Sequence, residues 1–132
     1  MKITVNGAPI SKKRPRFARI GKGVRTYNAQ QTEEGRWLWE AQQQIDAAMQ
    51  GAVKAAFIFY MPIPKSTSKK ATSAILGGDN AHIKKPDLDN LIKFAKDCLN
   101  GVAWHDDSQV CELTARKIYG EQPRTEIIIE AG

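Results

Sequence analysis

Two aspartates one residue apart, within the stretch KKPDLDNLIK at positions 84–93, are the side chains of this sequence best suited to metal chemistry. A proline directly precedes Asp87, and proline favours an extended backbone in the residue before it. In an extended segment residues i and i+2 point to the same side, so Asp87 and Asp89 can present their carboxylates together. A second acidic pair follows at positions 106–107. Clustered carboxylates supply the oxygen ligands that Mg²⁺ and Mn²⁺ prefer.

Each acid also fits a structural role when it is taken alone. Asp87 or Asp89 can cap a helix that begins at this point. Asp89 and Lys93 stand four residues apart, the spacing of a solvated ion pair on one helical face. The pair at 106–107 is typical of a turn. The connection after the expected helix is short, and we expect it to fold one of these later carboxylates back toward the first two.

The two histidines and one tryptophan lie close to these acids in the sequence. His82 and His105 are possible ligands or phosphate contacts, but magnesium sites prefer oxygen, which favours structural roles for both. Trp104 has no periodic polar partners and is expected in the core or at an interface. The two cysteines, Cys98 and Cys111, lack metal-site spacing and are expected to be buried reduced thiols.

Positive charge is concentrated at the N-terminus. Residues 1–32 contain eight Lys or Arg and no acid, whereas the remaining hundred residues carry twelve bases and fourteen acids. A basic segment of this kind is typical of one that meets phosphate, although a solvated basic surface is the alternative. No apolar leader or membrane-length apolar run is present, which favours a cytoplasmic protein with no membrane partner.

The hydrophobic pattern predicts one α+β domain over residues 1–132, a two-layer sandwich of a small mixed or antiparallel sheet backed by two main helices. Strands are expected at 3–5, 52–60, 109–119 and 124–130, with 8–10 as a possible returning strand. Helices are expected at 32–50 and 89–100, with a possible short one near 68–76. Basic loops are expected at about 11–28 and 65–86.

Several spaced residues together carry a resemblance to a known family. The motif KPDLDNLxK at 85–93 is followed by DxLNG at 97–101 and WxDDSQV at 104–110, and KKRPRF at 12–17 stands upstream. This set resembles the RusA family of Holliday-junction resolvases, which are small and often prophage-borne endonucleases. The match extends over most of the chain and is densest between residues 84 and 110.

The resemblance implies a homodimeric, Mg²⁺- or Mn²⁺-dependent endodeoxyribonuclease that binds four-way DNA junctions and cuts two strands symmetrically. It places the metal ligands on Asp87, Asp89 and Asp107, and the catalytic lysine on Lys93. Asp106 is a supporting acid, and the spacing leaves open which of the two adjacent acids faces the metal. The bases expected to contact DNA phosphates are Lys12, Lys13, Arg14, Arg16, Arg19, Lys69, Lys70, Lys84 and Lys85.

Two other functions fit the same sequence. One is a basic DNA-binding accessory protein without catalysis, whose acids serve as caps and turn residues. The other is a metal nuclease that acts on a flap or another branched DNA. Phe17 is either a wedge at the strand-exchange point or a buried anchor of its loop.

Overall fold

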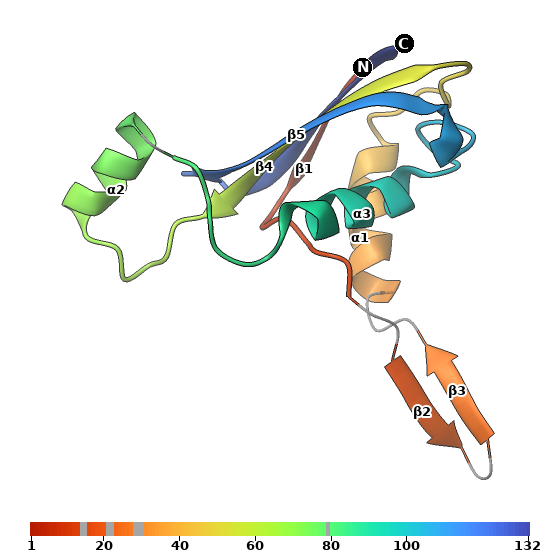
Figure 1. Cartoon of the computed structure of the whole chain (residues 1–132), viewed down its shortest axis with the longest axis horizontal. Coiled ribbons are helices and arrows are strands. Elements are labelled where there is room, and N and C mark those ends of the chain that lie inside the picture. Colours follow the sequence, from red (N-terminus) through yellow and green to blue (C-terminus); the bar gives the residue numbers. More distant parts are fainter. Residues whose placement is uncertain (14–15, 21–22, 28–30, 79) are drawn as a thin grey trace.

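The computed structural model describes residues 1–13, 16–20, 23–27, 31–78 and 80–132, and for 16–20, 23–27 and 31 it describes the backbone alone. Figure 1 shows the arrangement of the elements. Along the chain these are β1 (Lys2–Asn6), β2 (Arg16–Ile20), β3 (Gly23–Tyr27), α1 (Gln31–Gln42), β4 (Val53–Pro62), α2 (Lys69–Gly77), α3 (Leu88–Leu99), the 3₁₀ turn η1 (Asp107–Gln109), β5 (Val110–Gly120) and β6 (Arg124–Ala131).

The main sheet has four strands in the order β1-β6-β4-β5. β6 pairs antiparallel with both β1 and β4, whereas β4 and β5 are parallel. Parallel neighbours need a long crossover, and the segment between β4 and β5 that carries α2 and α3 provides it. The predicted small mixed sheet is therefore confirmed, as is the α+β class.

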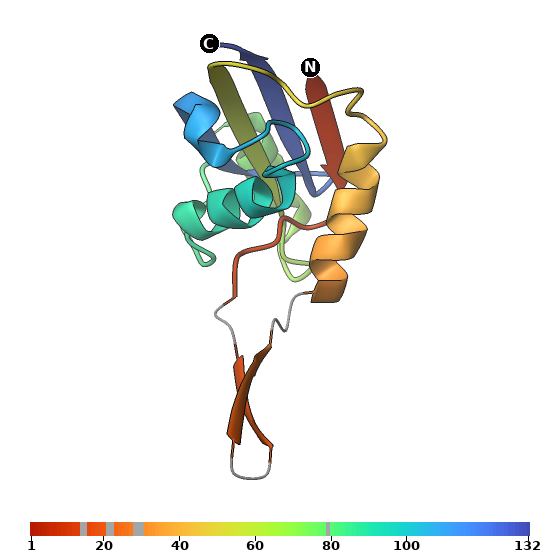
Figure 2. The same cartoon turned by 90° about the vertical axis from the view of Figure 1, so that its right-hand side faces the viewer.

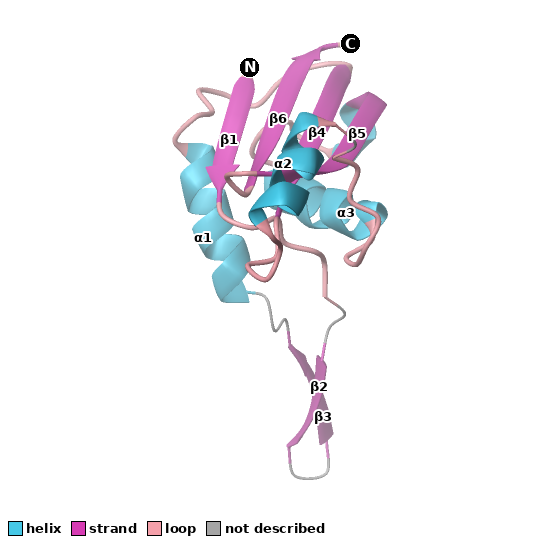
Figure 3. Cartoon of the chain, turned by 90° about the vertical axis from the view of Figure 1, so that its left-hand side faces the viewer, coloured by secondary structure: helices cyan, strands magenta, loops and turns pink. Residues whose placement is uncertain are grey.

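The core lies between one face of this sheet and helices α1 and α3 (Figure 2). Side chains along β4 alternate strictly between buried and more exposed positions, and Phe57 and Phe59 are among the fully buried ones. α3 buries the stripe that begins at Leu91, as its helical period predicts. The two helices meet where Trp37 packs edge-on against Phe94, with ring centroids 6.0 Å apart. Figure 3 shows the strands side by side, with α1 and α3 behind them.

The first long helix ends earlier than its hydrophobic period predicts, at Gln42 rather than near residue 50. The side-chain amide of Gln44 accepts a hydrogen bond from the Thr4 backbone amide and donates one to the Thr4 carbonyl, both at 2.8 Å. Further on, the Met49 amide donates to the Ala103 carbonyl. Residues after Gln42 therefore form hydrogen bonds with backbone groups at the outer edge of β1 and in the segment before η1. A helix that continued past Gln42 would leave these backbone groups unpaired.

Two expectations near the N-terminus are wrong. Residues 8–10 form no strand beside β1, whose partner is β6 instead. Residues 11–27, expected to be an irregular basic loop, contain the antiparallel pair β2–β3, which projects away from the sheet (Figure 1). β-branched and aromatic residues recur along both strands and favour extended pairing despite the many bases.

The cysteines differ in their burial. Cys98 on α3 is buried, as expected, and burial raises the pKa of its thiol to about 12. Cys111 is exposed, which corrects the expectation for that residue. It lies on β5, an edge strand of the main sheet. Among the helices that the structure describes, none combines the length and the apolar character needed to cross a membrane.

Candidate active site

Asp87 and Asp89 stand together at the N-terminal end of α3. Asp87 is the N-cap residue and has extended backbone angles, but its side chain makes no capping hydrogen bond. Asp89 is in the first turn and is exposed. The positive end of the helix dipole favours both carboxylates at this position. Because Asp87 does not cap the helix, capping does not explain an aspartate at that position.

Exposed lysines stand close to Asp87 and Asp89 along the chain. The Lys85 ammonium is 3.1 Å from an Asp87 oxygen, but with 86% of the Lys85 side chain exposed this pair is weak. Lys93 is exposed, one helical turn beyond Asp89. The site therefore combines two carboxylates and nearby ammonium groups on an open surface, as binding to a charged polymer requires.

Asp106 and Asp107 have different environments. One oxygen of Asp107 accepts a hydrogen bond of 2.9 Å from the indole of Trp104, which is fully buried. Trp104 is therefore a core residue, as expected, and it fixes the orientation of Asp107. Asp106 is exposed and caps η1 by accepting a hydrogen bond from the Ser108 amide. Hydrogen bonds with the Ser108 side chain and then with its backbone lower the pKa of the Asp106 carboxyl. Capping explains Asp106, whereas Asp107 presents a carboxylate held in place by the core.

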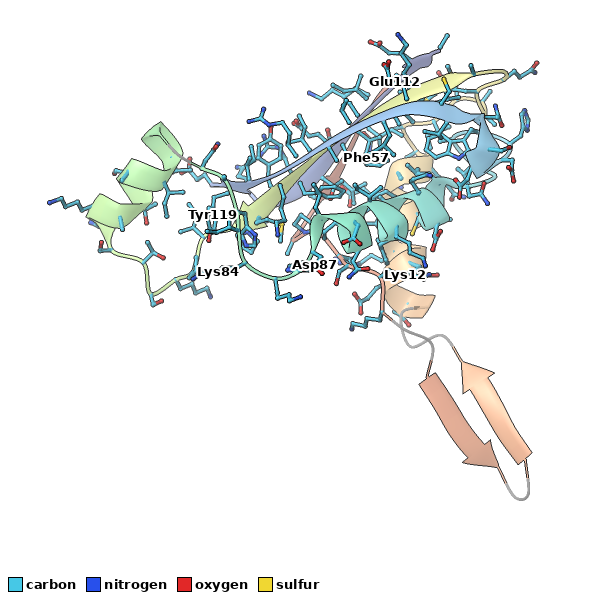
Figure 4. The ribbon with its side chains drawn as sticks, viewed as in Figure 1. Lys12, Phe57, Lys84, Asp87, Glu112 and Tyr119 are labelled. Atoms are coloured by element: carbon cyan, nitrogen blue, oxygen red, sulfur yellow. The ribbon has the colours of Figure 1, made fainter. Side chains whose placement is uncertain are left out.

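The expectation that Asp107 folds back toward Asp87 and Asp89 is wrong within one chain. α3 has 12 residues, so its ends are about 18 Å apart. Asp87 begins α3, whereas the bonds that fix the segment before η1 lie beyond its other end. In Figure 1 the start of β5 likewise lies at the end of α3 opposite Asp87, which Figure 4 labels.

The separation of Asp107 from Asp87 and Asp89 decides whether one chain can bind Mg²⁺ or Mn²⁺ through all three acids. Asp87 and Asp89 provide oxygen donors of the kind that Mg²⁺ or Mn²⁺ binds. Within the described part of the chain, however, no group of three or more His, Cys, Asp or Glu side chains is placed to hold a metal ion. A single chain thus supplies two acids at one end of α3 and a third at the other, and it does not form a three-carboxylate site.

Comparison with known proteins places this arrangement in a family. The family model described as "Endodeoxyribonuclease RusA" matches residues 6–130. The chain belongs to the RusA family. It is also 36% identical, over 98% of its length, to a protein of Bacillus subtilis (strain 168) named "Uncharacterized protein YqaN", of which the match covers 94%. The sequence resemblance is therefore confirmed, and membership indicates an endodeoxyribonuclease, whose substrate is DNA.

The nine bases of this RusA-family chain that are expected to contact DNA fall into three groups. Lys69 and Lys70 begin α2, and Lys84 and Lys85 precede Asp87; all four are exposed. The Arg16 and Arg19 backbones lie on β2, but their side chains, and Arg14 entirely, lie outside the described residues, as does the Phe17 side chain.

Lys12 and Lys13 bind within the chain. The Lys12 ammonium is 3.2 Å from Glu34 on α1 and 3.3 Å from Asp97 on α3. Burial lowers the pKa of Lys12, but hydrogen bonds and attraction from the two carboxylates outweigh it and raise the pKa. Lys13 pairs with Glu33 at 3.2 Å. These two lysines therefore tie the chain that leads into β2–β3 to both helices.

Three further side chains near the site are those of His105, His82 and Lys117. His105 is exposed. His82 packs on Tyr119, with ring centroids 4.8 Å apart, and burial and then the Lys117 charge lower its pKa. The sequence did not indicate a role for Lys117, because a lysine within a strand is usually expected to face solvent. In the structure its ammonium contacts the backbone just before Asp87.

Proposed function

We propose that this protein is a metal-dependent, structure-specific endodeoxyribonuclease of the cytoplasm that resolves four-way DNA junctions by paired, symmetric hydrolysis. The observation that carries the proposal is the acidic pair at the N-terminal end of α3. Asp87 occupies the N-cap without capping, and exposed lysines lie beside it. Membership of an endodeoxyribonuclease family supports the same reading.

The position of the third acid supports a homodimer. α3 runs from Asp87 toward the Asp107 end, and β5 runs back again. A two-fold axis beside the middle of these elements would reverse the partner's α3 and bring the partner's Asp107 end to Asp87. Each of the two sites would then combine Asp87 and Asp89 from one chain with Asp107 from the other. A four-way junction also has two-fold symmetry, which matches two such sites.

The outer edge of β5 is a suitable surface for contact between two chains related by such an axis. β5 is an edge strand of the sheet, and its hydrogen bonds to residues 80–82 involve its C-terminal end. Leu113, near its middle, is exposed although it is apolar. An exposed sheet edge with an apolar side chain favours pairing with a second copy.

Each group of residues in the site would have a different role in phosphodiester hydrolysis. A divalent cation bound by the three acids would supply charge neutralisation and an activated water. Lys93, on the same helical face as Asp89, would place its ammonium toward the phosphate and offset charge that develops on it. Lys84 and Lys85 would hold the strand beside the acids by contacting neighbouring phosphates.

The salt dependence of binding tests the role of the bases. If six lysines and arginines contact the duplex arms, the logarithm of the binding constant should fall with the logarithm of salt concentration with a slope of about −5. Replacing both Lys84 and Lys85 with alanine should flatten this slope by about 2. Lys54→Ala, on β4 and paired with Glu112, serves as the control. A slope near zero for the unmodified protein would refute phosphate tracking.

Cleavage of defined DNAs tests the function itself. We expect Mg²⁺ to support cutting of a mobile four-way junction at two symmetric positions, and EDTA to abolish it, because the acids need a cation to act. A flap and a linear duplex of the same sequence are the matched substrates. Preferential cutting of the flap would favour another branched-DNA nuclease. Tight junction binding with no metal-dependent cutting would favour a non-catalytic accessory protein.

A further inference from the structure

The Lys117 side chain bonds to the backbone that carries Asp87. Lys117 lies on β5, and its ammonium donates to the Lys84 carbonyl at 2.6 Å and to the Pro86 carbonyl at 2.7 Å. The second of these carbonyls belongs to the residue directly before Asp87. One half-buried ammonium thus fixes two points of the connection that leads into α3.

Other contacts hold the earlier part of the same connection. The His82 amide donates to the Lys117 carbonyl at 3.1 Å, and the Tyr119 amide donates to the Asn80 carbonyl at 2.7 Å. The rings of His82 and Tyr119 are in contact as well. Residues 80–82 are therefore joined to β5 through the backbone, whereas residues 84–86 are joined to it through the Lys117 side chain. Figure 4 shows Lys84 and Asp87 on this connection, with Tyr119 beside it.

The strand that provides Lys117 is firmly placed. Lys117 is in register with Phe59 of β4, one of the fully buried residues of the core. Its two bonds join a charged donor to carbonyl oxygens, which makes them stronger than neutral hydrogen bonds. Metal ligands must be held close to their working geometry by such supporting contacts. Without Lys117, the residues next to Asp87 lose this link to β5.

We infer that Lys117 is a positioning residue for the acidic site: it orients the Asp87 carboxylate by anchoring the Lys84 and Pro86 carbonyls, without itself touching DNA or the cation. This inference rests on the proposed function. It predicts that loss of the anchor weakens cation binding, whereas a merely structural lysine would change only the fraction of folded protein.

The test compares Lys117→Met, which keeps the aliphatic length but removes the donors, with Lys117→Arg, which keeps charge and donors. Lys54→Met is the matched control, because Lys54 is an exposed lysine on the neighbouring strand that pairs with Glu112. Junction cleavage is measured against Mg²⁺ concentration. We expect the Mg²⁺ midpoint of Lys117→Met to rise about 10-fold or more, with the rate recovering at saturating Mg²⁺. Lys117→Arg should restore much of the loss.

Two measurements that need no cleavage accompany this titration. Mn²⁺ binding, followed by electron paramagnetic resonance, should weaken in Lys117→Met by a similar factor. Amide hydrogen exchange should quicken at residues 84–91 and stay slow in β4 and β6, which also shows that the variant is folded. Lys117→Gln is used for both measurements if Lys117→Met does not fold.

The outcomes separate the two proposals. If the unmodified protein binds Mn²⁺ and cuts but the Lys117 variants keep its Mg²⁺ midpoint, or Lys54→Met shifts it equally, the inference about Lys117 is wrong and the proposed function stands. An unmodified protein that neither binds Mn²⁺ nor cuts the junction would overturn the proposed function, and the role of Lys117 with it.

Discussion

Asp87→Asn is expected to abolish junction cleavage while leaving junction binding intact or slightly tighter. The substitution keeps the size of the side chain and removes the charge that would bind a cation. Loss of groups that only orient metal ligands typically costs about 10–100-fold in affinity or activity, so we expect a loss of at least about 100-fold here. Binding should not weaken, because a negative charge beside phosphate has been removed.

Asp97→Asn is the matched control for this substitution. Asp97 is also an exposed acid of α3, but it pairs with Lys12 near the other end of the helix. Cleavage rates and gel-shift affinities for the same four-way junction measure both variants. An Asp87→Asn protein that cuts at the unmodified rate would remove Asp87 from the mechanism.

Asp107→Asn is expected to cause a loss as large as that of Asp87→Asn, although about 18 Å of helix separates the two acids in one chain. An asparagine oxygen can still accept the Trp104 indole hydrogen bond, so the fold should be preserved. The lost charge should therefore act on catalysis alone. We again expect cleavage to fall at least about 100-fold.

The adjacent acid provides the control. Asp106→Asn keeps the cap of η1, because asparagine and aspartate are equally good N-caps, and its cleavage rate should stay within about twofold. Single-turnover cleavage of the junction, with thermal melting as a check on folding, separates the two variants. A large loss at Asp106 with none at Asp107 would exchange their proposed roles.

Much of the fold was predictable because burial leaves a period in the sequence. The strict alternation along β4 and the apolar stripe of α3 both follow from having one buried face, and the structure confirms both elements. The end of α1 was not predictable, because it depends on Gln44 bonding to Thr4, a contact between residues 40 apart. The β2–β3 pair was missed because its bases masked the pattern of its β-forming residues.

The sequence predicted where Asp87 and Asp89 lie, but not where Asp107 lies relative to them. The spacing of Asp87 and Asp89 placed both at the start of α3, since two residues along the chain cannot be far apart. The position of Asp107 was wrong because a short connection returns the chain to the near end of a helix, not to its start. Lys117 left no signal, because its partners are backbone carbonyls, which every residue possesses.

A mixed dimer tests most directly whether two chains share each active site. Asp87→Asn and Asp107→Asn chains, carrying different tags, are co-expressed and the mixed dimer is purified. One of its two sites would carry both substitutions and the other neither, so it should nick one strand of the junction at about half the total rate of the unmodified dimer, while each variant alone stays inactive. A purified mixed dimer as inactive as its parents, or a protein that stays monomeric on DNA, would contradict the shared site.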